Sequence, residues 1–261
     1  MNQTLRTLLL SLPLLLAGTA RADGVLHGPE LISSKPLGYD LQYWIYMPEG
    51  FERGLPELYV TDGAGYLAEG RMVEELDREI SAGRIAPVAV VFVDSRDPHE
   101  PSNDRRHEQF MCNADYARFF VGELMPRIST RWTHGDKSTR RGLMGVSFGA
   151  INAACFGVML PGVFQVLALH SPGGPEHIDV IDRLYRERPQ HDSAFFVSHG
   201  GSRDNEKEVE SLVATLEELG YRVRHVATEG KHEWRYWRPL IDDALQAFVG
   251  TAPGDRVDGD M

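Results

Sequence analysis

Short apolar runs alternate along the chain with stretches whose apolar residues recur every three or four positions. The run over residues 88–94 is apolar at every position before Asp94, which is typical of a strand covered on both faces. The same signals predict further strands. These cover residues 40–47, 57–61, 141–146, 164–170, 194–198 and, with a more polar pattern typical of a sheet edge, 221–227.

Amphipathic patterns predict helices between these strands. Residues 206–219 have one apolar face and are followed by Gly220, a residue that often ends a helix. Asn113 is the expected N-cap of a helix over residues 114–128. The remaining predicted helices cover residues 70–82, 150–159 and 239–249.

Strands that alternate with helices imply an α/β fold, with a mostly parallel sheet and helices on both faces. We expect a single domain over residues 23–250. Two irregular, charged segments, residues 97–112 and 171–192, are predicted to be long loops. Both leave the carboxyl edge of the sheet, where such folds bind ligands, so they are expected to frame a substrate.

Both ends of the chain differ from this central part. Residues 1–22 contain a short apolar core followed by Ala20-Arg21-Ala22, the pattern of a cleavable signal peptide. The core is too short to span a bilayer, so we expect cleavage between Ala22 and Asp23 and a periplasmic or secreted protein. Residues 251–261 are polar and predict a flexible tail.

The formal net charge of −11 argues against nucleic acid or an anionic membrane as a partner. A small molecule is the expected partner, and the oligomeric state stays open. The chain has two cysteines, Cys112 and Cys155. We favour free thiols, with Cys155 packed as a small buried hydrophobe, although an exported protein would also permit a disulfide.

The segment Gly145-Val146-Ser147-Phe148-Gly149 matches the G-x-S-x-G pattern of a nucleophile elbow. It follows a predicted strand and precedes a predicted helix rich in small residues, which is the context the pattern requires. Glycine is needed on both sides because the serine occupies a strained turn, where flanking side chains would collide with the adjacent strand or helix. The pattern therefore predicts that Ser147 is a nucleophile.

A serine nucleophile needs a base, which an acid orients. His232 fits the order nucleophile, acid, base along the chain, and His199 is its strongest rival. Asp204, on the loop after the predicted strand 194–198, is the preferred acid. Glu206 and Glu208 are alternatives for that role, and Asp204 could instead be only a helix N-cap.

Two backbone N–H groups should bind the oxyanion of the reaction. One is the amide of Phe148, directly after the nucleophile. The other comes from the loop Thr61-Asp62-Gly63-Ala64-Gly65, whose glycines let the backbone approach a substrate. Ala64 is the preferred donor and Gly63 the next.

The chain resembles an esterase branch of the α/β-hydrolases that includes esterase D, feruloyl esterases, mycolyltransferases and enterochelin esterases. The resemblance covers residues 58–248. It is carried by Asp62-Gly63, by the elbow, and by His232 followed by Trp234, Trp237 and Arg238. Further segments resemble enterochelin esterases in particular: Arg106-His107-Glu108, Cys112-Asn113-Ala114-Asp115-Tyr116 and Glu123-Leu124-Met125-Pro126.

The resemblance implies an α/β-hydrolase fold and a serine esterase that uses Ser147 and His232. Asp204 completes the expected triad from its place on the loop after the predicted strand 194–198. Enterochelin esterases hydrolyse the trilactone of a catecholate siderophore, so that substrate is the most specific expectation. An acyltransferase, a feruloyl or acetyl esterase, and a ligand-binding protein on the same scaffold are the alternatives. The histidines lack a tight metal-ligand spacing such as H-E-x-x-H, and neither a metal nor an organic cofactor is expected.

An iron-loaded tricatecholate is an anion, so an acidic protein would need a local cationic site to bind it. Arginines near the expected pocket and one tryptophan could bind the charge and stack on the catechol rings. The expected substrate-binding residues are Arg105, Arg106, Trp234, Arg238 and, at the end of a predicted strand, His170.

Overall fold

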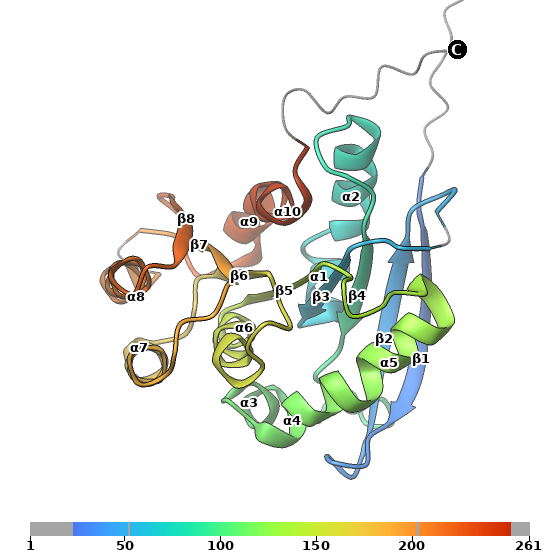
Figure 1. Cartoon of the computed structure of the whole chain (residues 1–261), viewed down its shortest axis with the longest axis horizontal. Coiled ribbons are helices and arrows are strands. Elements are labelled where there is room, and N and C mark those ends of the chain that lie inside the picture. Colours follow the sequence, from blue (N-terminus) through green and yellow to red (C-terminus); the bar gives the residue numbers. More distant parts are fainter. Residues whose placement is uncertain (1–22, 52, 202–203, 252–261) are drawn as a thin grey trace, which may run out of the picture.

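An eight-stranded sheet runs through the protein in the order β1-β2-β4-β3-β5-β6-β7-β8 (Figure 1). The computed structural model describes residues 23–51, 53–201 and 204–251. The expected signal peptide, and the expected tail apart from Thr251, lie outside these residues. The strands are β1 (Val25–Ser33), β2 (Asp40–Met47), β3 (Glu57–Thr61), β4 (Ala89–Val93), β5 (Arg141–Val146), β6 (Val166–His170), β7 (Ala194–His199) and β8 (Arg222–Ala227).

The predicted fold class is confirmed. Strands β3 to β8 pair in parallel, and only β1 and β2 are antiparallel to their neighbours. The pattern did not predict β1, because most of its residues are exposed and Gly28 and Pro29 interrupt its alternation. The pairing of β1 with β2 shifts register between His27 and Glu30, at that same interruption.

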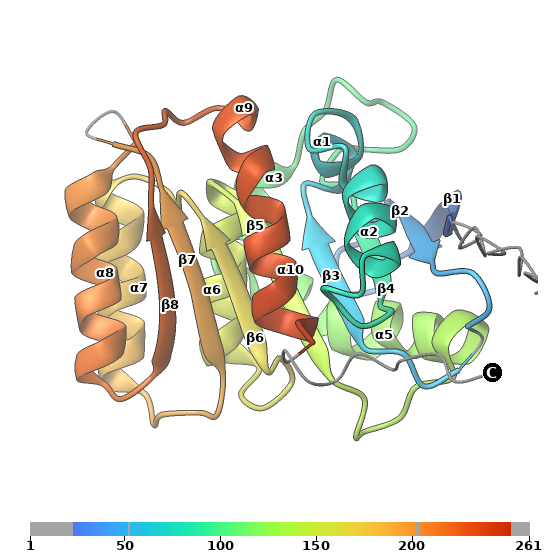
Figure 2. The ribbon, with the colours of Figure 1, turned by 90° about the horizontal axis from the view of Figure 1, so that it is seen from above.

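Helices cover both faces of the sheet (Figures 1 and 2). One face carries α1 (Gly63–Ala68), α2 (Met72–Ser81), α9 (Trp234–Trp237), η3 (Arg238–Leu240) and α10 (Ile241–Val249). The other carries α3 (Arg106–Phe110), a continuous helical segment of α4 (Ala114–Phe119), η1 (Phe120–Leu124), α5 (Met125–Ile128) and η2 (Ser129–Thr133), then α6 (Phe148–Met159), α7 (Pro175–Glu187) and α8 (Glu206–Glu218).

Each buried strand contributes to two apolar cores, one under each helical layer. In β3, Leu58 and Val60 pack toward α2 and α10, whereas Tyr59 packs with the residues of α6. This follows from the alternation of side chains along a strand, and it explains why the central strands are apolar at nearly every position. Among the described residues, no helix has both the length and the apolar character needed to cross a bilayer.

The two predicted long loops contain helices. The segment 171–192 forms the 13-residue helix α7, which begins at Pro175 and buries Ile178, Ile181 and Tyr185. Proline is well suited to the first turn of a helix, and these three residues form one apolar stripe. Charged positions surround that stripe, and Pro and Gly residues precede it. For this reason the sequence indicated a loop rather than a helix. The segment 97–112 contains the shorter helix α3.

The expectation of free thiols was wrong. Cys112, just after α3, and Cys155, on α6, form a disulfide with their Cα atoms 5.0 Å apart. The cysteines are 43 residues apart in the sequence, which gave no sign of their proximity. The bond ties the segment that carries α3 to the helix that follows Ser147. Asn113 caps the next helix as predicted, because its side chain accepts hydrogen bonds from the N–H groups of Asp115 and Tyr116.

Candidate active site

Ser147 lies in a strained turn between β5 and α6. Its φ of 56° and ψ of −117° are rarely adopted by a residue other than glycine. A Cβ on Gly145 would lie 2.2 Å from the carbonyl carbon of Gly149, and a Cβ on Gly149 would lie 2.7 Å from Asp62 Oδ2. Both glycines of the pattern are therefore required by close packing around the turn.

The structure brings together the three side chains that the sequence grouped as nucleophile, base and acid. His232 Nε2 lies 2.8 Å from Ser147 Oγ, and His232 Nδ1 lies 2.6 Å from Asp204 Oδ1. An ionised carboxylate only accepts hydrogen bonds, so it favours the tautomer with the proton on Nδ1. Nε2 is then free to accept the proton of the Ser147 hydroxyl.

Asp204 is held as a buried, ionised carboxylate. Its side chain is 1% exposed, and its Oδ2 accepts hydrogen bonds from the Ser171 hydroxyl and from the Gly200 N–H, each at 2.5 Å. Burial acts to raise the pKa of Asp204, but the hydrogen bonds from His232, Ser171 and Gly200 outweigh it and lower the pKa.

The residues next to Asp204 test two alternatives: that Asp204 is only a helix N-cap, and that Glu206 or Glu208 is the acid. Asn205, rather than Asp204, is the N-cap residue of α8. Glu206 and Glu208 lie in the first turn of that helix, whereas Asp204 is the carboxylate in contact with His232.

One tryptophan near the histidine was not among the expected site residues. Trp237 packs edge-on against the His232 ring, with the ring centroids 4.9 Å apart, and its Nε1–H donates to Ser171 at 2.8 Å. Trp237 therefore supports both the histidine and the hydroxyl that binds Asp204. Its sequence signal was its position five residues after His232, on the same short segment.

The two other candidate histidines lie elsewhere. His199 is buried, and its ring stacks on that of His225 at 5.0 Å, so it does not compete for Ser147. His170 was expected to line the pocket, but it is fully buried and its Nδ1 lies 2.8 Å from Ser198 Oγ. Burial lowers the pKa of His170 to about 3, so this ring is neutral at ordinary pH.

The two expected oxyanion donors begin two helices beside Ser147. Phe148 is the first residue of α6, and Ala64 is the second residue of α1. N–H groups in the first turn of a helix have no acceptor within that helix, so both amides can bind an anion. Gly63 is tightly packed, because a Cβ there would lie 2.6 Å from the carbonyl carbon of Phe92.

A pocket of about 760 Å³ opens over Ser147 and His232. Its wall also includes Ala64, Trp234 and Trp237. The charged side chains on the wall are mostly acidic. They are Asp62, Glu69, Asp94, Asp104 and Glu233, and the arginines on the wall are Arg96 and Arg106.

The expected cationic site is not assembled as the sequence suggested. Arg106 lines the pocket, but it is paired with Asp62. Arg105 is paired with Asp97, and its guanidinium lies over the Tyr39 ring at 4.2 Å. Neither Arg105 nor Arg238 is among the residues that form the pocket wall.

Trp234 does reach the pocket, where it packs against Gly65: a Cβ on this glycine would lie 2.6 Å from the indole ring. Sequence reasoning missed the cation Arg96 and its partner Asp94, which lie 2.8 Å apart. Asp94 directly follows β4, so its place at the carboxyl edge of the sheet was available as a signal.

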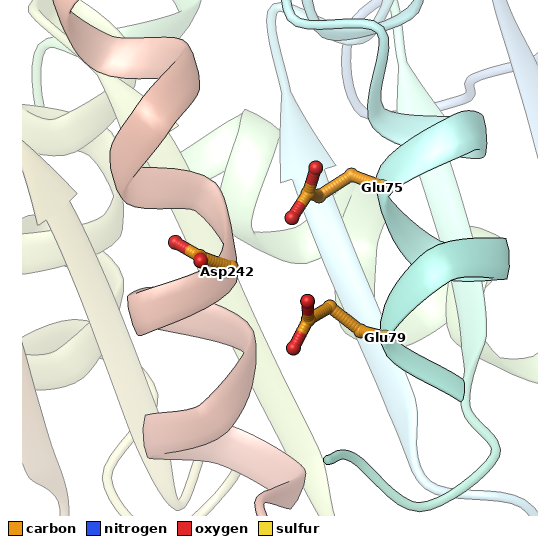
Figure 3. Close-up of side chains that lie close together, drawn as sticks. All are labelled: Glu75, Glu79 and Asp242. Atoms are coloured by element: carbon orange, nitrogen blue, oxygen red, sulfur yellow. The ribbon is translucent and has the colours of Figure 1, made fainter. Parts of the chain in front are cut away.

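A group of carboxylates outside the pocket approaches the geometry of a metal site. Glu75, Glu79 and Asp242, on α2 and α10, offer oxygen atoms within 4.8 Å of one another (Figure 3). Arg78 contacts all three carboxylates, and Arg84 donates hydrogen bonds to both oxygens of Glu79. Arginines thus compensate this charge, and the cluster joins two helices.

Comparisons with known proteins identify the family. The family model described as "Putative esterase" matches residues 34–248. YjcH, an uncharacterized protein of Bacillus subtilis (strain 168), is 25% identical over 228 residues, which cover 83% of this chain and 94% of that protein. The iron(III) enterobactin esterase of Yersinia enterocolitica is 29% identical over 142 residues, which cover 53% of this chain and 38% of that enzyme.

The fold has a solved counterpart. The enterobactin esterase of Shigella flexneri, in the presence of 2,3-dihydroxy-N-benzoyl-glycine, matches with a TM-score of 0.73 at 19% identity, over 86% of this chain and 58% of that one. This chain therefore spans less than two thirds of the length of both enterobactin esterases. Because the family match extends over most of the chain, the protein belongs to the putative esterase family and is a carboxylic ester hydrolase with the α/β-hydrolase fold.

Proposed function

We propose that the protein is a serine esterase in which Ser147 is the nucleophile, His232 the general base and Asp204 the orienting acid. The observation that carries the proposal is the continuous hydrogen-bonded chain from Ser147 Oγ through the His232 ring to the buried Asp204 carboxylate. In triads of this kind the acid fixes the imidazole tautomer and stabilises the imidazolium that forms during the reaction.

The reaction proceeds in two halves. Ser147 Oγ attacks the ester carbonyl while His232 Nε2 takes the hydroxyl proton, and the amides of Phe148 and Ala64 bind the oxyanion. The C–O bond to the alcohol then breaks, and His232 returns the proton to the leaving alkoxide oxygen. Water, activated by the same histidine, attacks the acyl-enzyme and releases the acid together with free Ser147.

The trilactone of a catecholate siderophore is the proposed natural substrate. Two observations support it: the relatives named as enterobactin esterases, and a pocket of about 760 Å³ that is large enough for a bulky ester. Trp234 and Trp237 on the pocket wall are aromatic surfaces against which catechol rings could stack.

A labelling experiment and a substrate panel test the proposal. A fluorophosphonate probe should form an adduct on Ser147, located by mass spectrometry, and labelling of another serine would refute the assigned nucleophile. The panel should contain the trilactone, a feruloyl ester and nitrophenyl acetate, each with and without an added alcohol. Transfer of the acyl group to the alcohol in preference to water would identify an acyltransferase, and absence of both labelling and turnover would indicate a binding protein.

We further propose that the protein is exported after cleavage between Ala22 and Asp23. The Cys112–Cys155 disulfide supports this, because such bonds persist mainly in oxidising compartments. N-terminal sequencing of protein from the culture medium and the periplasm should begin at Asp23. Recovery of a chain that begins at Met1 and remains in the cytoplasm would refute export.

A further inference from the structure

Arg106 connects three segments that meet at Ser147. Its Nε and one terminal nitrogen donate to the two oxygens of Asp62, at 2.6 and 2.9 Å. The same terminal nitrogen donates to the carbonyl of Val146, the residue before Ser147, at 3.1 Å. The guanidinium also lies 5.6 Å from the ring centre of Phe148, the residue after Ser147.

Asp62, the partner of Arg106, begins the other half of the oxyanion site. It is the N-cap residue of α1 with a left-handed φ of 59°, and its carbonyl accepts from the N–H groups of Gly65 and Tyr66 at 2.8 and 3.2 Å. Its carboxylate packs against Gly149 in the first turn of α6. Asp62 is therefore in contact with the helix that begins at Phe148 while it starts the turn that contains Ala64.

We propose that Arg106 and Asp62 form a positioning pair that sets the distance between the two oxyanion amides, those of Ala64 and Phe148. This inference rests on the proposed serine esterase mechanism. Two hydrogen bonds from Arg106 to Asp62, and a third from Arg106 to the carbonyl of Val146, link α1 to the elbow. Moving either amide by about 1 Å would weaken its hydrogen bond to the oxyanion, and misplacements of that size can cost about 10²-fold in rate.

The geometry favours positioning over recognition of substrate charge. The guanidinium faces a carboxylate and a carbonyl at hydrogen-bond distance, and the Arg106 and Asp62 side chains are only 27% and 11% exposed. Burial opposes both charges: Asp62 outweighs it at Arg106 and raises the pKa of the guanidinium, whereas at Asp62 burial outweighs Arg106 and raises the pKa of the carboxyl group. The hydrogen-bond geometry, rather than the charge, therefore defines the pair. An anionic substrate would have to compete with this preformed pair.

Substitutions of Arg106, assayed on a neutral and an anionic ester, test the proposal. With nitrophenyl acetate and nitrophenyl hemisuccinate, Arg106→Met should lower kcat by about 10²-fold on both esters and change KM by less than about two-fold. Arg106→Lys should fail to restore kcat, because a lysine cannot make the forked contact. A boronic acid, whose serine adduct carries the oxyanion charge, should bind Arg106→Met about 10²-fold more weakly.

Two further variants separate positioning from general damage. Asp62→Asn should lower kcat like Arg106→Met, and the double variant should be little worse than either, because the two side chains act as one unit. Arg141→Met removes another arginine from a buried pair, that with Glu57 at 2.9 Å, at the opposite end of β5. It should lower the melting temperature but leave kcat of the folded enzyme unchanged.

The outcomes are distinct. A rise in KM confined to the anionic ester, or recovery of kcat in Arg106→Lys, would show that Arg106 binds substrate charge and would overturn the inference. An equal loss of kcat in Arg141→Met would assign the effect to lost stability and would overturn it as well. If wild-type protein neither hydrolyses these esters nor reacts with fluorophosphonate at Ser147, the proposed function itself has failed.

Discussion

Among single residues, the proposed mechanism gives Ser147 and His232 one joint task, so their substitutions should not have additive effects. Ser147→Ala should lower kcat by about 10⁴-fold or more, and His232→Ala should be nearly as severe. The double variant should be little worse, because the hydroxyl has no activated form without its base. Asp204→Ala should be milder, and Glu206→Ala, which removes a carboxylate from α8, serves as its control. A larger loss of kcat in Glu206→Ala than in Asp204→Ala would show that Glu206, rather than Asp204, is the acid.

The ionisation of Asp204 also predicts how stability depends on pH. Its pKa in the folded protein lies below the ordinary value of 3.8, so the native state favours the carboxylate. This contribution is fully present above about pH 4 and is lost as the pH falls through the folded-state pKa. Melting temperatures of wild type and Asp204→Asn should therefore converge as the pH falls below 4, where the carboxylate becomes protonated. A difference that persists unchanged when the pH is lowered further would contradict this assignment.

At the scale of elements, the disulfide fixes the segment that carries α3 to α6. Removing it with Cys112→Ser and Cys155→Ala should lower the free energy of unfolding by about 2–4 kcal/mol, since the unfolded chain gains freedom. Hydrogen exchange should become faster over residues 106–110, because these precede Cys112 directly. Dithiothreitol should destabilise wild type in the same way and leave the double variant unaffected. Equal free energies of unfolding for the oxidised wild type and the double variant would show that the disulfide does not stabilise the protein.

For the molecule as a whole, the proposed siderophore substrate should be selected by charge. The chain has a formal net charge of −11, and carboxylates outnumber arginines on the pocket wall. An iron-loaded tricatecholate is an anion, whereas the iron-free trilactone is close to neutral. We expect a lower KM for the iron-free form and a difference that shrinks as salt rises, since exposed charges are screened over about 8–10 Å near physiological ionic strength. Tighter binding of the iron-loaded form at low salt would contradict this expectation.

The order of residues was enough to predict the central strands and the elbow, because both depend on neighbours in the chain. A strand covered on two faces must be apolar at successive positions, and a serine in a strained turn must have glycine nearby. His232 followed from the order of functional residues along such chains. The sequence favoured Asp204 as the acid but did not exclude Glu206 or Glu208, because all three lie within five residues of one another.

The contacts of Arg106 and of the two cysteines could be known only from the folded protein. Arg106 and Asp62 are 44 residues apart. They meet because β3 lies beside β5, which brings the turn after β3 next to the elbow, and because α3, which carries Arg106, packs against α6. Cys112 and Cys155 meet for a similar reason, since α3 packs against α6. Local periodicity reports which face of an element is buried, but not which element covers it. The partners of Arg106 and of the two cysteines therefore became visible only once the sheet order was known.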